Sequence, residues 1–131
     1  MSGSITEAQQ RFITRYSDLL KELEDVLAYV SECYIKDDTD IGDRLLRDVM
    51  AGILPYDPEN MTIVSIFGDD PEALEVLGHF HDAALQAAQV EKLEDTGERM
   101  HLLHEILLAC YKEWYTVVTR KKADLKTSAE S

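Results

Sequence analysis

Apolar positions recur at helical spacing along most of this chain. In the first stretch, which runs to about residue 35 without Gly or Pro, they alternate at intervals of four and three residues. These positions are Phe12, Tyr16, Leu19, Leu23, Val26, Val30 and Cys33, flanked by Ile13, Leu20, Leu27 and Tyr34. The pattern predicts one long amphipathic helix, roughly 45 Å long at 1.5 Å per residue.

Three more stretches carry the same periodicity. The second helix follows the acidic residues 37–40, which offer N-caps, and ends before Pro55. The third starts at Pro71 and runs to about residue 92, and the last starts after Gly97 and ends in the cations of residues 119–122. The apolar stripes are Ile41, Leu45, Val49 and Ile53, then Ala73, Val76, Phe80, Ala83, Ala87 and Val90, and finally Met100, Leu103, Leu107, Cys110, Trp114 and Val117.

A short helix is predicted between the second and third of these. The sequence Asp-Pro-Glu occurs at 57–59 and again at 70–72, and each copy supplies an Asp cap and a Pro in the first turn. Only a short helix fits between two such starts, over about residues 59–67, closed by Gly68. Residues 61–67 are also β-branched enough for a strand, but a lone strand has no partner elsewhere in the chain.

Together these elements predict an all-α fold, an up-and-down helical bundle of four main helices plus one short helix. We expect a single bundle domain over residues 1–122, followed by a polar tail, residues 123–131, that frays. No stretch approaches the length of an apolar membrane span and the start lacks a signal-peptide pattern, so we expect a cytoplasmic protein. Cys33 and Cys110 lie on the apolar stripes and are expected to be free thiols.

Charge narrows the range of partners. The chain has a net charge of −13, which disfavours nucleic acid and anionic membranes as ligands. The acid is concentrated in the middle: residues 57–98 carry −10, whereas residues 1–16 carry +1 and residues 99–131 carry +2. Such a negative region can steer a basic partner by long-range attraction.

Metal chemistry is the alternative suggested by four histidines on two adjacent helices, His79, His81, His101 and His104. Glu98 and His101 form one Glu-x-x-His pair, but di-iron bundles need two such pairs and further Glu residues. The Glu-x-x-Glu pairs at 72–75 and 91–94 have a spacing that suits magnesium. However, the sequence shows neither a basic cluster nor a glycine-rich loop to hold a phosphate-bearing substrate. We therefore expect no cofactor, no metal site and no catalytic residue, and keep a metal-dependent hydrolase that uses bundle carboxylates and histidines as the alternative.

The function favoured by the sequence is a non-enzymatic helical bundle that binds another protein, basic or amphipathic in character. The segment between the second and third main helices carries more apolar side chains than one short helix can bury, so we assign partner binding to Tyr56, Met61, Ile63 and Phe67. In size, acidity and helical pattern the chain resembles bacterial secretion or flagellar export chaperones, which implies a small adaptor, regulator or chaperone. A homodimer is a further expectation, because the long first helix can leave Phe12, Ile13 or Tyr34 uncovered.

Overall fold

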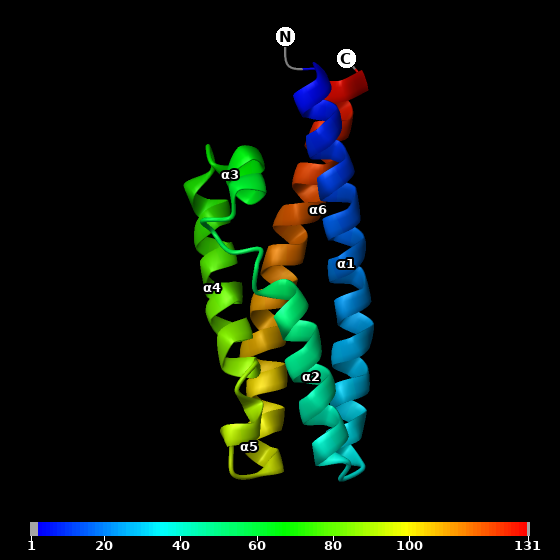
Figure 1. Cartoon of the computed structure of the whole chain (residues 1–131), viewed down its shortest axis with the longest axis vertical. Helices are drawn as coiled ribbons and strands as arrows, with labels where there is room; N and C mark the ends of the chain where they lie inside the picture. Colours follow the sequence, from blue (N-terminus) through cyan, green and yellow to red (C-terminus); the bar gives the residue numbers. More distant parts are fainter. Residues whose placement is uncertain (1–2, 131) are drawn as a thin grey trace.

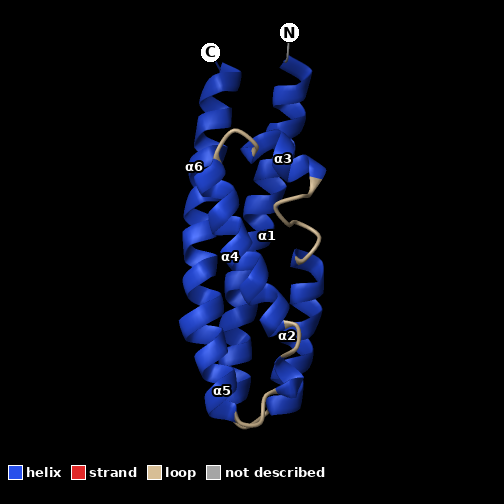
Figure 2. Ribbon diagram, turned by 90° about the vertical axis from the view of Figure 1, so that its left-hand side faces the viewer, coloured by secondary structure: helices blue, strands red, loops and turns tan. Residues whose placement is uncertain are grey.

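The computed structural model of the chain describes residues 3–130, with side chains over residues 7–125. This part of the chain contains helices and no strand (Figures 1 and 2). The helices are α1 (Gly3–Ile35), α2 (Thr39–Ile53), α3 (Met61–Phe67), α4 (Pro71–Ala87), the short 3₁₀ turn η1 (Val90–Lys92), α5 (Thr96–His101), the π-helical segment η2 (Leu102–Leu107) and α6 (Leu108–Glu130). Since α5, η2 and α6 follow one another without a break, the predicted all-α bundle of four main helices plus one short helix is confirmed.

The main helices alternate in direction along the bundle (Figure 1). The first helix, α1, packs on α2 and α6, while α4 packs on α6, η2 and α2. The N-terminal end of α1 and the C-terminal end of α6 lie side by side and extend beyond α3, and α5 lies at the opposite end of the molecule (Figures 1 and 2). In the described part of the chain, no helix is both long enough and apolar enough to cross a membrane.

The turn between α1 and α2 is formed by the acidic residues that follow Ile35. Asp37 has a positive φ of 68°, the left-handed conformation that commonly ends a helix. Its N–H donates to the carbonyl of Tyr34 at 3.3 Å, and the N–H of Asp38 donates to the carbonyl of Cys33 at 2.7 Å. Asp38 precedes α2, but its side chain forms no capping hydrogen bond. This acidic stretch therefore serves more to end α1 than to cap α2.

The start of α3 differs from the prediction, whereas the start of α4 agrees with it. Asn60 caps α3, because its side-chain oxygen accepts from the N–H groups of Thr62 and Ile63 at 2.9 and 3.1 Å. Asp57 forms only a local turn, in which its carboxylate accepts from the N–H of Glu59 at 2.9 Å. The Asn60 amide also donates to the carbonyl of Pro55 at 2.9 Å, which closes the loop and sets the helix start later than residues 57–59. At α4, Asp70 accepts from the N–H of Ala73 at 3.1 Å, as predicted.

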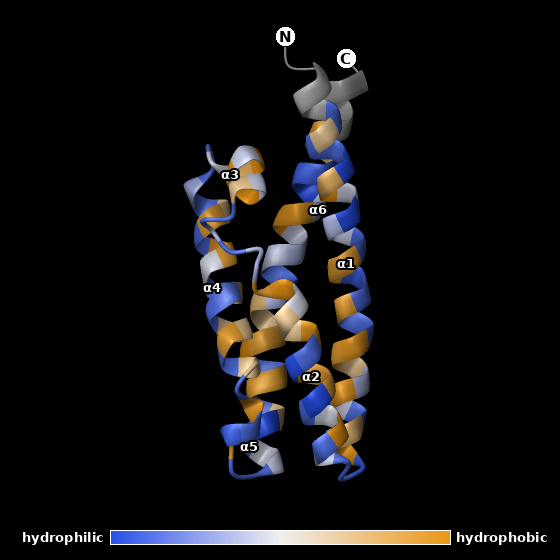
Figure 3. Cartoon of the chain, viewed as in Figure 1, coloured by the Kyte–Doolittle hydropathy of each residue, from blue (hydrophilic) through white to orange (hydrophobic). Residues whose placement is uncertain are grey.

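One core runs the length of the bundle and is closed at one end by aromatic side chains. Apolar residues recur along α1 and α6 (Figure 3). Trp114 is completely buried, and its indole N–H donates to the hydroxyl oxygen of Tyr16 at 2.8 Å. The Phe67 ring lies 5.1 Å from the Trp114 ring, so the short helix α3 contributes to the same core.

The buried face of the last helix differs in part from the predicted stripe. Leu103, Leu107 and Trp114 are buried as expected, but beyond η2 the other core positions are Tyr111 and Val118 rather than Cys110 and Val117. A π-helical turn holds more residues than an α-helical turn, because its hydrogen bonds run from i to i+5. The π-helical segment η2 therefore changes which side chains face the core, a change that a regular helical period does not reveal.

Two further expectations change in the structure. The last helix was expected to stop at residues 119–122, but α6 continues to Glu130, since no Gly or Pro interrupts it. The reason given for a homodimer is also removed, because Ile13 is 0 % and Tyr34 2 % exposed within one chain. Phe12 is half-buried and stacks on Tyr16 at 5.5 Å. Self-association thus stays a prediction, but no longer because these three side chains are uncovered.

Two glycines in α2 are expected to respond oppositely to replacement by alanine. A Cβ on Gly42 would lie 2.7 Å from the buried Tyr34 ring, whereas a Cβ on Gly52 would meet nothing within 4 Å. Gly52→Ala should raise the free energy of unfolding by about 0.5–1 kcal/mol through helix propensity. Gly42→Ala should lower the free energy of unfolding by about 1 kcal/mol or more, because overpacking against the Tyr34 ring outweighs the gain in helix propensity. Urea unfolding of both variants measures the difference, and equal stabilisation would contradict the close packing at Gly42.

Stability is expected to fall at alkaline pH because of three buried tyrosines. Burial raises the pKa of Tyr16, Tyr34 and Tyr111 above the ordinary value, and for Tyr34 the hydrogen bond to Asp43 and the charge of that carboxylate raise the pKa further. The unfolded chain then ionises first, so the stabilisation is complete below about pH 10 and is lost as pH rises above that value. Urea midpoints between pH 8 and 11 measure the slope. Tyr111→Phe should reduce the slope; titration of Tyr16, Tyr34 and Tyr111 near pH 10 in the folded protein would contradict this account.

Candidate functional site

A groove lies where α4 meets α5 and η2, at the end of the bundle opposite the chain termini. Apolar side chains from the connecting loop and from η2 line it together with polar residues of α4 and α5. The lining residues are Gln86, Gln89, Lys92, Leu93, Asp95, Gly97, Glu98, His101, Leu102 and Ile106. Leu93 and Ile106 are half-buried and the polar lining residues are exposed. The groove therefore has an apolar floor and a charged rim, a composition typical of binding sites.

The loop that borders this groove is held by two carboxylates. Asp95 caps α5, since its side chain accepts from the N–H of Glu98 at 2.8 Å. The carboxylate of Glu98 reaches back and accepts from the N–H of Glu94 at 3.0 Å. This reciprocal arrangement resembles a capping box and fixes the loop between η1 and α5. Both carboxylates thus shape the groove and supply its negative rim.

A buried polar network anchors α5 to α1 and α2. Arg99 on α5 is 8 % exposed, and its guanidinium donates to both carboxylate oxygens of Asp43 on α2 at 2.9 to 3.2 Å. The Tyr34 hydroxyl on α1 donates to the same carboxylate at 2.7 Å. Arg99 also donates to the carbonyl of Asp95 at 3.3 Å, which connects the network to the groove loop. The hydrogen bond to Asp43 holds the Arg99 pKa above the ordinary arginine value, so the guanidinium keeps its charge.

The comparisons with known proteins place the chain in one family. A family model described as "Domain of unknown function (DUF8042)" matches residues 11–117. The chain belongs to this family. No curated protein and no solved structure matches the chain. The matched range contains the groove and the Asp43 network of this DUF8042 protein and ends before Lys122.

The four partner-binding residues predicted from the sequence lie in three different environments in this DUF8042 protein. Ile63 and Phe67 are completely buried in the core, so neither presents a surface to a partner. Tyr56 is half-buried, with its ring 5.0 Å from that of Tyr16. Met61 is 87 % exposed. The excess of apolar residues arises because α3 packs on both α1 and α4, which buries more of its surface than one contact face would.

The histidines are spread over the bundle instead of converging. His104 shares a hydrogen bond of 2.9 Å with the Ser31 hydroxyl, and His81 shares one of 3.2 Å with the carbonyl of Leu54. His79 and His101 are exposed, and His101 lines the groove. Among the side chains that the structure describes, no three His, Cys, Asp or Glu residues are grouped so as to hold a metal ion. The metal-dependent hydrolase thus remains a prediction without a described site.

The cysteines are free, as expected, and differ in burial. Cys33 is buried and Cys110 only half-buried, because η2 displaces the core face of the last helix. Burial raises the pKa of both thiols, and neighbouring carboxylates add to the effect. A raised pKa disfavours the thiolate, the form that acts as a nucleophile.

Sequence reasoning missed the residues that form the groove and its anchor. Leu93, Leu102 and Ile106 lie outside the predicted apolar stripes, and Asp43 belongs to a stretch rich in acids. One signal was available: Arg99 is a lone cation next to a strongly acidic segment, where an ion pair is a natural expectation.

Proposed function

We propose that this protein is a non-enzymatic binding module whose groove accepts a basic, amphipathic helix of a partner protein. The observation that carries the proposal is the groove itself, in which Leu93, Leu102 and Ile106 are surrounded by polar side chains. Amphipathic helices bind other proteins by placing apolar side chains, spaced at i, i+3, i+4 and i+7, in such grooves. An adaptor, a regulator and a chaperone would all use this mode of binding.

Charge supports a basic partner. Residues 57–98, which end in the groove, carry a net charge of −10, and Asp95 and Glu98 lie on the rim. Lys92 and His101 are the basic side chains in the same lining. A surplus of acidic side chains accelerates association with a cationic helix and disfavours binding of an anionic helix.

Rigidity supports the proposal as well. Arg99 and the two capping carboxylates fix α5 and the loop before a ligand arrives. A preformed site loses less conformational freedom on binding than a mobile one, so more of the contact energy becomes affinity. The π-helical geometry of η2 adds to the argument, because π-helical turns occur frequently at functional sites.

The experiment is a titration with two designed helical peptides that share one apolar face. One peptide carries Lys and the other Glu on its polar face, and fluorescence anisotropy measures the dissociation constant. We expect the Lys peptide to bind at least tenfold more tightly, with an association rate that falls as salt rises from about 50 to 300 mM.

Two variants locate the binding site. Ile106→Asp places a charge on the groove wall and should weaken binding of the Lys peptide at least tenfold. Leu85→Asp is the matched control, because Leu85 is 43 % exposed and lies outside the groove lining. Equal binding by both variants, or equal binding of both peptides by the native protein, would refute the proposal.

A further inference from the structure

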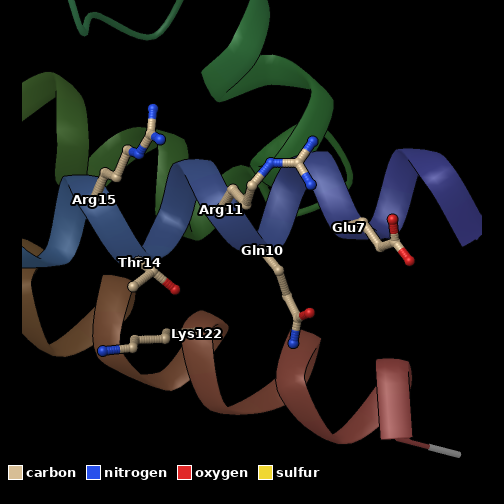
Figure 4. Close-up of a pocket in the computed structure, with 6 residues that line it drawn as sticks. All are labelled: Glu7, Gln10, Arg11, Thr14, Arg15 and Lys122. Carbon is tan, nitrogen blue, oxygen red and sulfur yellow. The ribbon is translucent and has the colours of Figure 1, made fainter.

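A second pocket lies at the opposite end of the molecule, where α1 and α6 run side by side. Its lining residues are Glu7, Gln10, Arg11, Thr14, Arg15 and Lys122. Gln10 and Thr14 point from α1 towards α6, and Lys122 extends beside them from α6 (Figure 4). The guanidinium groups of Arg11 and Arg15 project from α1 in the opposite direction, away from α6 (Figure 4). Three cationic side chains and one acidic side chain thus line a single pocket.

These cations lack acid partners within the part of the chain whose side chains are described. Arg47 pairs with Glu91 and Arg99 pairs with Asp43, but no ion pair involves Arg11, Arg15 or Lys122. That arrangement is unexpected in a chain in which 26 acidic residues face 13 Lys and Arg residues. Arg11 and Arg15 are also four residues apart on one helix, a spacing at which like charges repel. An anion in the pocket would relieve this repulsion.

The polar groups of the pocket suit an oxyanion. Guanidinium groups donate two parallel hydrogen bonds to phosphate-type oxygens, and an ammonium adds a compact charge. The Gln10 amide and the Thr14 hydroxyl add neutral donors beside Lys122. Glu7, at the edge of the pocket, is the single acid in the lining and leaves the local balance positive.

We infer that this pocket binds a small polyvalent phosphate, either free or as the phosphate group of a small molecule. Its position, at the end opposite the groove, makes it independent of the proposed helix binding. A nucleic acid is disfavoured because the surrounding molecule carries a net charge of −13 and would repel an extended polyanion. A compact anion needs only the pocket that these three cations line. The sequence showed no basic cluster, and the structure assembles one from the two ends of the chain.

Isothermal titration calorimetry with inorganic tripolyphosphate, without divalent cations, tests the inference. We expect saturable one-to-one binding that weakens with added salt, and orthophosphate at least tenfold weaker than tripolyphosphate. Arg11→Gln and Lys122→Gln should each weaken binding at least fivefold, and the double variant should abolish it. Lys36→Gln, which removes the same charge at the far end of α1, is the control and should change the affinity less than twofold.

Three outcomes would overturn the inference. The first is the absence of saturable binding at low salt. The second is an equal loss in Lys36→Gln, which would show an effect of overall charge alone. The third is tighter binding of a hexaglutamate peptide than of tripolyphosphate with loss in the same variants, which would assign the pocket to acidic peptides. Circular dichroism checks that each variant folds. We expect each to do so, because Arg11 is exposed and Lys122 half-exposed.

Discussion

Replacing Asp43 with alanine is expected to lower the free energy of unfolding by about 3–5 kcal/mol, the range measured when one partner of a buried ion pair is removed. Arg99 would then remain 8 % exposed without the carboxylate that accepts its hydrogen bonds. The Tyr34 hydroxyl would lose its acceptor as well. Urea unfolding followed by circular dichroism measures the loss.

Graded substitutions separate charge from packing in this network. Tyr34→Phe removes one hydrogen bond and should cost about 1 kcal/mol. The double variant Asp43→Leu with Arg99→Met removes both charges and should recover much of the stability lost in Asp43→Ala. Asp48→Ala, at an exposed acid of the same helix, is the control. If Asp43→Ala were no more destabilising than Asp48→Ala, the network would not hold α5 in place.

Trp114→Ala is expected to be the other severe substitution, with a loss of about 3–5 kcal/mol. The indole is completely buried, and it contacts the Phe67 ring of α3 and the Tyr16 ring of α1. Its removal would leave a cavity between three helices and the Tyr16 hydroxyl without its indole donor. Thermal unfolding followed by circular dichroism measures the effect, because Trp114 is the single tryptophan and its fluorescence disappears with it.

The comparison with phenylalanine at the same position tests this explanation. Trp114→Phe keeps an aromatic ring and loses the N–H group, so it should cost about 1–3 kcal/mol. Val117→Ala changes a half-buried position on the neighbouring face and should cost less than either. A loss in Trp114→Ala as small as that in Val117→Ala would show that α3 and α1 repack around the cavity.

Local signals in the sequence were sufficient to locate the helices. The stripe in α1 and the cap at Asp70 depend on residues within one or two turns of each other, so they can be recognised without a fold. The start of α3 was missed because Asn60 gains a contact to Pro55 that the Asp-Pro-Glu pattern does not show. The core face of α6 was displaced because η2 departs from the regular helical period.

The candidate sites were harder to predict from the sequence than the helices. Ile63 and Phe67 were assigned to a partner surface because a single short helix was expected to have one contact face, but α3 packs against two helices. The groove was not predicted, since Leu93 and Ile106 become neighbours only through the loop between η1 and α5 and the π-helical turns of η2. The hydrogen bonds of His81 and His104 join segments far apart in the sequence, so the local pattern does not reveal their partners.

The sequence by itself determined that this chain forms a helical bundle, where its main helices lie and that its middle is strongly acidic. Those properties depend on periodicity, capping and composition, which are local or additive. Only the tertiary structure decided that Asp43 meets Arg99, and that Arg11, Arg15 and Lys122 line one pocket. Such contacts depend on how far each helix is rotated and shifted against its neighbours, and the packing of the whole core fixes that register.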